Sequence, residues 1–176
     1  MAIRPIVLYP DPVLLTPTRP VELIDDDLLR LVDDMVDTMY DEPGVGLAAN
    51  QVGVDLRLCV IDLSVGEDPE GLHVLVNPEV KATEGSQVGE EGCLSFPDIT
   101  LDIDRPYRAT VEAQNLDGET FVLEGEGLMA RALLHEIDHL DGQVFLRHVS
   151  SLKREIVKRQ IRKRMKSGDW VAAEAQ

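Results

Sequence analysis

Cysteine is scarce in this chain of 176 residues, which has only two, and tryptophan occurs once. Two cysteines allow at most one disulfide, which excludes a disulfide-rich secreted scaffold. Cys59 lies in the apolar run of residues 56–63, which is typical of a buried strand, whereas Cys93 follows a glycine in a polar segment. Because the two settings differ and residues 1–15 do not resemble a signal peptide, we expect no disulfide between them.

Long apolar runs are also absent, since no stretch approaches the roughly 20 apolar residues that a membrane-spanning helix needs. No organelle transit peptide is apparent either, so we expect a cytoplasmic protein without a membrane segment. With 44% hydrophobic residues and no obvious repeat or linker, the chain can form a single core. We predict one monomeric domain over residues 1–166, followed by a flexible tail over residues 167–176.

Hydrophobic periodicity predicts helices at residues 25–41 and around residues 128–140, with Gly142 suited to end the second helix. The first helix is expected to stop before Pro43-Gly44. A third, basic helix is expected at about residues 151–166. Strands are predicted at residues 56–63, 74–80, 109–115 and 120–123. This order of elements indicates the α+β class.

The motif His135-Glu136-Ile137-Asp138-His139 carries the strongest chemical signal in the chain. Two histidines four residues apart project from one face of a helix, so both imidazoles can bind one divalent metal ion. The Glu136 carboxylate lies nearby but is poorly placed to bind the same ion, which leaves it free to handle protons on water. Apolar neighbours surround the motif, and buried imidazoles need a partner. The pattern therefore favours a metal-dependent hydrolase over a solvated helix face.

A catalytic site of this type usually has three protein ligands and one position open for water. Metzincin peptidases supply a third histidine, but the corresponding position here is Phe145. The glutamate-ligand zincins use a later helix, where this chain offers only Glu155 among lysines and arginines. Cys93 is the better candidate, because thiolate is a strong ligand and the adjacent glycine permits close approach.

Residues 44–53, GVGLAANQVG, are rich in glycine and alanine and do not match a phosphate-binding loop. Such a cluster after a helix can form a simple turn. If the segment instead folds over the metal, the side-chain amide of Gln51 is suited to donate a hydrogen bond to an oxyanion.

These three segments together resemble the signature motifs of peptide deformylases, in order and in separation. The family patterns GxGLAAxQ, EGCLS and HExxH stand here as GVGLAANQ, EGCLS and HEIDH, and the likeness extends to about residue 165. The resemblance implies an α+β fold in which mainly antiparallel sheets pack around a central metal-binding helix, with an N-terminal and a C-terminal helix. It also implies metal-dependent hydrolysis of the formyl group from N-formylmethionyl nascent peptides, with release of formate.

By position, the resemblance makes Glu136 the general acid and base, and it assigns the oxyanion to the metal, the Gln51 amide and the backbone N–H of Leu94. The implied metal ligands are Cys93, His135 and His139. An apolar pocket would hold the methionine side chain. The positions that match this pocket are Val45, Gly46, Leu94, Leu128 and Ala132.

Two positions depart from common family patterns. Leu134 stands where a glutamine often precedes the HExxH motif, and Arg131 lies near the expected pocket, so the shape of the pocket is in question. The family also tends to keep an acid before the motif cysteine and an arginine after it. A pair between Glu91 and Arg105 would brace the cysteine loop, unless both charges are solvated at the surface.

One divalent metal ion per chain is expected, but the ligands and the resemblance differ on its identity. One thiolate with two imidazoles favours zinc. The resemblance implies iron(II), and nickel, cobalt or zinc could occupy purified protein.

Positive charge is concentrated near the C-terminal end. Residues 147–166 hold nine of the 17 lysines and arginines and one acid, Glu155, in a chain whose formal net charge is −16. A basic helix on an acidic body suggests an anionic partner, and the resemblance makes ribosomal RNA the expected one. A solvated helix that partly neutralises its own acidic body is the other interpretation.

Two further functions stay open at this point, an HExxH metallopeptidase and a metal-stabilised RNA-binding module. A peptidase would cleave unformylated peptides, and a structural metal site would need a fourth protein ligand. His73 and His148 are available for that role. We expect His73 in a strand or at its edge, and His148 in a solvated turn.

Overall fold

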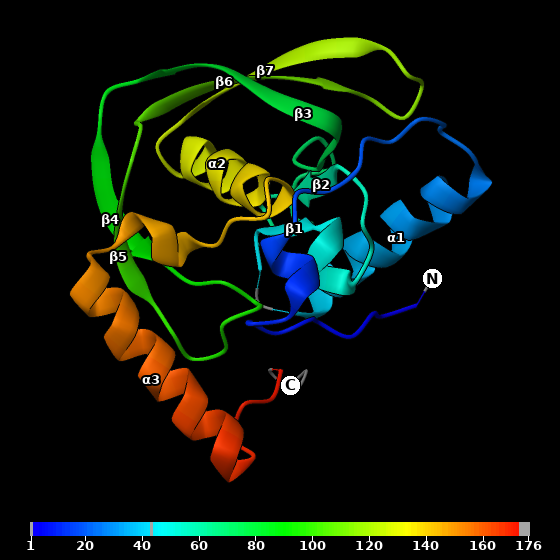
Figure 1. Ribbon diagram of the computed structural model, residues 1–176. Coiled ribbons are helices and arrows are strands. Elements are labelled where there is room, and N and C mark those ends of the chain that lie inside the picture. Colours follow the sequence, from blue (N-terminus) through cyan, green and yellow to red (C-terminus); the bar gives the residue numbers. More distant parts are fainter. Residues whose placement is uncertain (1, 43, 173–176) are drawn as a thin grey trace.

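The computed structural model describes residues 2–42 and 44–172 (Figure 1). Pro43, where the first helix was expected to stop, lies outside the described residues, as do residues 173–176 of the expected tail. The helices of the described chain are η1 (Pro12–Leu15), α1 (Asp26–Asp41), η2 (Ala49–Val52), α2 (Leu128–Leu140), η3 (Phe145–His148) and α3 (Ser151–Ser167). Its strands are β1 (Gly46–Ala48), β2 (Leu58–Ile61), β3 (His73–Glu84), β4 (Gln87–Glu91), β5 (Leu101–Arg105), β6 (Arg108–Gln114) and β7 (Thr120–Glu126).

Two antiparallel sheets carry the fold. Five strands form one sheet in the order β1-β2-β3-β6-β7, and β4 pairs with β5 in a separate two-stranded sheet. The long strand β3 pairs with β6 across two register shifts, between Val76 and Glu79 and between Val80 and Ala82. Such irregularities bend a strand, which helps the sheet to curve over α2.

Strand β2 lies at the centre of the core and is buried along its whole length. Leu58 and Val60 pack into the cluster that includes α1, whereas Cys59 and Ile61 pack against the apolar side of α2. Alternating side chains of one strand therefore serve two hydrophobic cores, which explains why its sequence is apolar without interruption. The expectation that Cys59 is a core residue is confirmed.

Helix α2 lies between the large sheet and the β4–β5 pair (Figure 1). Its close approach to the sheet depends on Gly125 of β7, because a Cβ there would lie 2.7 Å from Cγ of Met129 and 3.0 Å from Cδ1 of Leu133. The expected α+β fold, with mainly antiparallel sheets around a central helix and helices near both ends, is confirmed.

Side chains cap the N-termini of both outer helices. Asp25 accepts a hydrogen bond from the backbone N–H of Leu28 at the start of α1, and Ser150 accepts one from Lys153 at the start of α3. Among the described residues, no helix is long and apolar enough to cross a membrane.

The four expected strands are present with shifted ends, but β1, β4 and β5 were not predicted. The glycines of β1 and β4 weaken their strand pattern. In β5 the alternation was visible, because Leu101, Ile103 and Arg105 are buried and the two aspartates between them are exposed. Its buried arginine obscured that signal, since arginine is rarely buried unless it is paired.

Candidate metal centre and cleft

Three side chains with suitable ligand atoms converge at one point. The Sγ atom of Cys93 and ring nitrogens of His135 and His139 all lie within 4.8 Å of one another. Both histidines project from one face of α2, and Cys93 lies two residues after the end of β4. Within residues 2–42 and 44–172, no fourth cysteine, histidine or acid joins this cluster, which matches an open catalytic site better than a closed structural one.

Glu91 fixes the orientation of His135. The Nδ1 atom of His135 donates to Oε2 of Glu91 at 2.9 Å, which leaves Nε2 with a lone pair for a metal ion. Arg105 donates to both Glu91 oxygens, at 2.8 and 3.1 Å, and Arg131 donates at 2.8 Å. Burial alone would raise the pKa of Glu91, but the hydrogen bonds from His135 and Arg105 outweigh it and hold this pKa well below its usual value.

The Glu91–Arg105 pair is present, and it is buried rather than solvated, since both side chains are less than 5% exposed. Arg131, noted in the sequence only as a departure near the pocket, also donates to the backbone carbonyls of Gly89 and Ile103. It therefore ties α2 to both strands of the small sheet.

His148 is exposed, as expected, and it lies at the end of η3. Its Nε2 atom lies 2.7 Å from Oδ2 of Asp138, the same oxygen that accepts from Nη1 of Arg105 at 2.7 Å. His148 is therefore an exposed member of a hydrogen-bonded network that reaches Glu91 through Arg105, a role that the sequence did not indicate. His73 begins β3, as expected.

Glu136 is buried beside the cluster and lies close to the backbone of β1. A Cβ on Gly46 would be only 2.5 Å from Oε1 of Glu136, so a side chain there would displace this carboxylate. The other carboxylate oxygen, Oε2, is buried, and no hydrogen-bond partner is present for it within the described part of the chain. Burial is the main cause that raises the pKa of Glu136 to about 7, which suits a group that must take up and release a proton near neutrality.

The side-chain amide of Gln51 is held at both ends. Its Oε1 accepts from the backbone N–H of Ala48 at 2.9 Å, which directs Nε2 toward Ser95 Oγ at 3.3 Å and Cys93 Sγ at 3.6 Å. Gln51 thus presents a donor beside the proposed ligand, as the oxyanion hypothesis requires. Leu94 lies in the same cleft.

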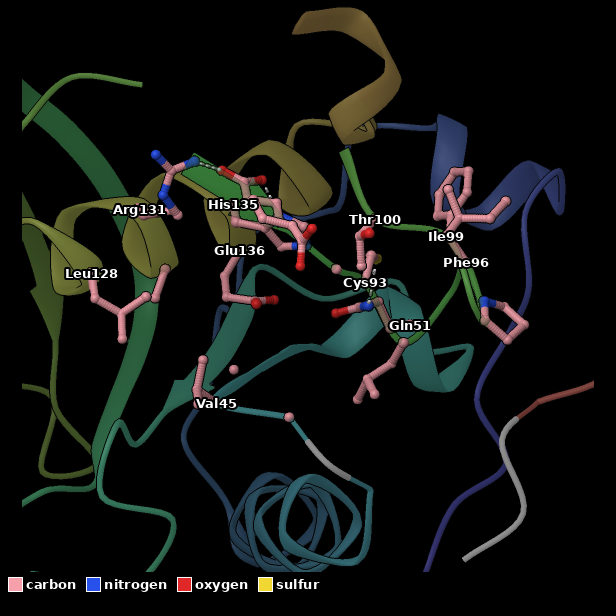
Figure 2. Close-up of a pocket in the computed structure, with 18 of the residues that line it drawn as sticks. Val45, Gln51, Cys93, Phe96, Ile99, Thr100, Leu128, Arg131, His135 and Glu136 are labelled. Carbon is pink, nitrogen blue, oxygen red and sulfur yellow. Dashed lines mark hydrogen bonds and ion pairs between the residues drawn. The ribbon is translucent and has the colours of Figure 1, made fainter. Parts of the chain in front are cut away.

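A cleft of about 430 Å³ opens onto these residues. The four remaining residues predicted for the methionine pocket, Val45, Gly46, Leu128 and Ala132, all line it. Figure 2 shows Val45, Leu128 and Arg131 on one side of Glu136, with Thr100 beside Cys93 on the other side and Phe96 and Ile99 beyond it. Residues 96–100 were missed as cleft residues, and the only signal in the sequence was their position directly after the cysteine motif.

The side chains present fit a bound divalent metal ion. The donor set combines one thiolate and two imidazoles, and an unpartnered carboxylate oxygen of Glu136 lies next to it. Burial is also the main cause that lowers the pKa of His139 well below its usual value, which favours the neutral ring that binds metals.

Comparison with known proteins agrees with this geometry. A family model described as polypeptide deformylase matches residues 3–155. The chain is 54% identical over 170 residues to a peptide deformylase of Acidobacterium capsulatum, covering 97% of this chain and 100% of that relative. A solved peptide deformylase structure from Legionella pneumophila is similar with a TM-score of 0.87 and 45% identity, covering 94% of this chain and 98% of that one.

A second solved structure, peptide deformylase from Ehrlichia chaffeensis in complex with actinonin, has a TM-score of 0.84 and 36% identity. It covers 93% of this chain and 98% of its own. The similarity therefore extends over nearly the whole fold and is not limited to the HExxH motif.

Proposed function

The chain belongs to the peptide deformylase family, whose metal-dependent hydrolases remove the N-formyl group from nascent peptides, and we propose that Glu136 moves the protons in that reaction. The observation that carries this proposal is the burial of Glu136 beside the Cys93–His135–His139 cluster, with one carboxylate oxygen that lacks a protein partner. A carboxylate in this position can take a proton from water and return it to the departing amine.

Cys93, His135 and His139 would hold one divalent metal ion per chain. When bound, the ion would acidify a water molecule and polarise the formyl carbonyl. Family membership supports metal dependence, and we propose iron(II) as the native ion, with nickel, cobalt or zinc as substitutes in purified protein. The thiolate and imidazole donors are compatible with each of these ions.

Glu136 would act first as a base and then as an acid. It would remove a proton from the attacking water, hold that proton in a site shielded from solvent, and deliver it to the amine nitrogen as the C–N bond breaks. The pKa of about 7, raised by burial, matches both roles near neutral pH.

Gln51 and Leu94 would stabilise the oxyanion that forms on the former carbonyl oxygen. Support for Gln51 comes from its fixed amide, whose Nε2 faces Cys93 while Ala48 holds Oε1. The backbone N–H of Leu94 adjoins the same cysteine in sequence. Removing one donor of this kind lowers kcat by on the order of 100- to 1000-fold.

The methionine side chain of the substrate would lie in the apolar part of the cleft. Its proposed contacts are Val45, Gly46, Leu94, Leu128 and Ala132, which all line the cavity. Arg131 also lines it, but its charge is neutralised by Glu91, so the pocket can still receive an apolar thioether.

The test is formate release from formyl-Met-Ala by anaerobically prepared protein, compared with a Glu136→Gln variant of equal metal content. We expect release by the parent and a loss of about 100- to 10,000-fold in kcat in the variant. Glu84→Gln, an exposed glutamate at the end of β3, is the matched control and should retain activity. A metal-loaded parent that releases no formate would contradict the proposed function.

For the basic helix α3, with Arg147 before it, we propose contact with ribosomal RNA. The charge of residues 147–166 supports this, because most of their lysines and arginines are exposed. Binding should weaken steeply with salt, as phosphate contacts do. Low-salt cosedimentation with ribosomes that survives alanine substitution of Lys158, Arg159, Arg162 and Lys163 would exclude this contact.

We further propose a cytoplasmic monomer with one catalytic domain over residues 1–166, in keeping with an enzyme that meets nascent chains during synthesis. Of the tail expected at residues 167–176, the structure describes residues up to Ala172. Trp170 in this segment packs against one of the hydrophobic core clusters.

A further inference from the structure

The C-terminal segment returns to the body of the molecule beyond the part that the family model matches, residues 3–155. Gly168 ends α3 in the left-handed conformation, with φ of 81°, and reverses the chain direction. Trp170 then donates from Nε1 to the backbone carbonyl of Tyr9 at 2.7 Å. The guanidinium of Arg164 lies 5.0 Å from the centre of the Trp170 ring, within the range of a cation–π contact.

Tyr9 continues this set of contacts toward the cleft. Its backbone N–H donates to the carbonyl of Ser95 at 3.0 Å, and its ring stacks on Phe96 with ring centres 4.8 Å apart. Ser95 Oγ in turn accepts from Gln51 Nε2. Trp170 is thus connected through one residue, Tyr9, to the segment that follows Cys93.

Arg164 reaches the same segment directly from α3. It donates to the carbonyl of Pro97 and to the carboxylate of Asp98, both at 2.9 Å. Asp98 has a left-handed backbone, with φ of 59°, which is uncommon for a residue other than glycine. Because the Asp98 side chain is 81% exposed, its ion pair contributes little by itself, and the bond to the Pro97 carbonyl matters more.

We propose that Arg164 and Trp170 are positioning residues that set the affinity for the formyl peptide by bracing residues 96–100, the cleft wall. The cleft wall lines the cleft on one side. On its other side it is supported by three residues, called the clasp below: Tyr9, Arg164 and Trp170. This inference rests on the proposed function, since the cleft is taken to be the peptide site.

Loss of the clasp should raise KM and leave kcat largely unchanged. A wall that samples several positions lowers the fraction of molecules ready to bind the peptide, which weakens apparent affinity. Gln51, in contrast, retains its separate anchor at Ala48, so the proposed oxyanion donor stays in place. Partial unfolding would have the opposite signature, a lower apparent kcat at constant KM.

The first measurement is steady-state formate release from formyl-Met-Ala by the metal-loaded full chain. Arg164→Met removes the bonds to the wall, and Trp170→Phe keeps a ring but loses the N–H donor. We expect each variant to raise KM by about 3- to 10-fold, the effect of losing one or two hydrogen bonds. Arg30→Met is the matched control, because this arginine is also ion-paired but lies exposed on α1.

The second measurement uses Trp170 as a reporter, because it is the only tryptophan in the chain. Formyl-Met-Ala is titrated into the Glu136→Gln variant, which holds the peptide without rapid turnover. We expect a saturable change in tryptophan emission, and its loss when Arg164→Met is added. Thermal melts of every variant record whether the fold is retained.

The outcomes separate the two proposals. If the parent releases no formate, the proposed function is contradicted. The emission titration still reports whether peptide binding in the cleft changes the environment of Trp170 in the clasp. Unchanged KM in both variants, or an emission spectrum that formyl-Met-Ala does not alter, overturns the positioning role. A fall in kcat alone, in proportion to the folded fraction, overturns it as well.

Discussion

At the scale of single residues, Glu91 connects three side chains around the candidate metal site. It accepts from His135, Arg105 and Arg131, which come from α2 and β5, and it is itself buried at the end of β4. The carboxylate therefore both orients His135 and pairs with two buried arginines, of which Arg105 also pairs with Asp138. Partners of this kind typically tune metal affinity as well as geometry.

We predict that Glu91→Gln lowers metal affinity by about 10- to 100-fold, because His135 loses its charged acceptor. The substitution also leaves buried positive charge uncompensated, which typically costs about 3–5 kcal/mol of stability. Competition with a chelator measures the first effect and urea unfolding the second. Glu84→Gln should change neither, and equal metal affinity in Glu91→Gln and the parent would contradict the orienting role.

The motif residues could be predicted from the sequence because each has a fixed chemical type at fixed spacing. His135 and His139 share a helix face, and only one cysteine lay in a setting suited to a ligand. The partner of His148 could not be predicted, since its bond to Asp138 depends on how η3 turns after α2. Arg131 and Glu91 are likewise far apart in sequence, so only the folded chain reveals their contact.

At the scale of elements, the position of α2 depends on one small residue in the sheet beneath it. Gly125 of β7 lets the helix approach closely, and a Cβ there would meet Met129, Leu133 and the backbone nitrogen of Ala130 at 3.1 Å or less. This contact sets the distance between the helix and the sheet. It thereby helps to fix the position of the two histidines.

We predict that Gly125→Ala destabilises the fold by about 1–3 kcal/mol, the usual effect of overpacking a core. Part of the clash can be relieved by Met129, a flexible side chain, but the contact with the Ala130 backbone cannot relax without a shift of α2. Urea unfolding measures the loss, and Glu124→Ala on the exposed face of the same strand is the control. A variant as stable as the parent would show that α2 moves freely.

The elements that could be predicted carry either a long helical period or an uninterrupted apolar run, and short strands that contain glycine or a buried arginine could not be predicted. The long helix α1 and the apolar strand β2 carry clear patterns that survive in the fold. Strand β1 has only three residues, one of which is glycine. Strand β4 contains a glycine against which Arg131 packs. The pairing of both strands is therefore set by tertiary contacts. The clasp could not be predicted from the sequence either, because Tyr9 and Trp170 lie near opposite ends of the chain.

At the scale of the whole molecule, charge is strongly divided. The net charge of −16 combines a basic segment at residues 147–166 with a body that is more acidic still. Mutual repulsion among the acids destabilises the compact state, and dissolved salt screens exposed charges. Added salt should therefore stabilise the folded state and weaken contact with an anionic partner.

We predict that raising NaCl from about 0.01 M to about 1 M, which shortens the Debye length from about 30 Å to about 3 Å, increases Tm. A gain of about 1 kcal/mol corresponds to roughly 2–4 °C for a chain of this size. Thermal melts monitored by circular dichroism measure it. At a pH nearer the sequence pI of 4.5 the gain should shrink, and a gain independent of pH would exclude charge repulsion as its cause.

The missing side chain at Gly46 has a consequence for inhibitors of this cleft. Any codon change that replaces this glycine adds at least a Cβ, which would lie 2.5 Å from Oε1 of Glu136. A substitution that confers resistance at this position would therefore displace the Glu136 side chain, the proposed proton-transfer group. A compound that makes its main contacts with the backbone of Gly46 would therefore bind at a position where any added side chain disturbs Glu136.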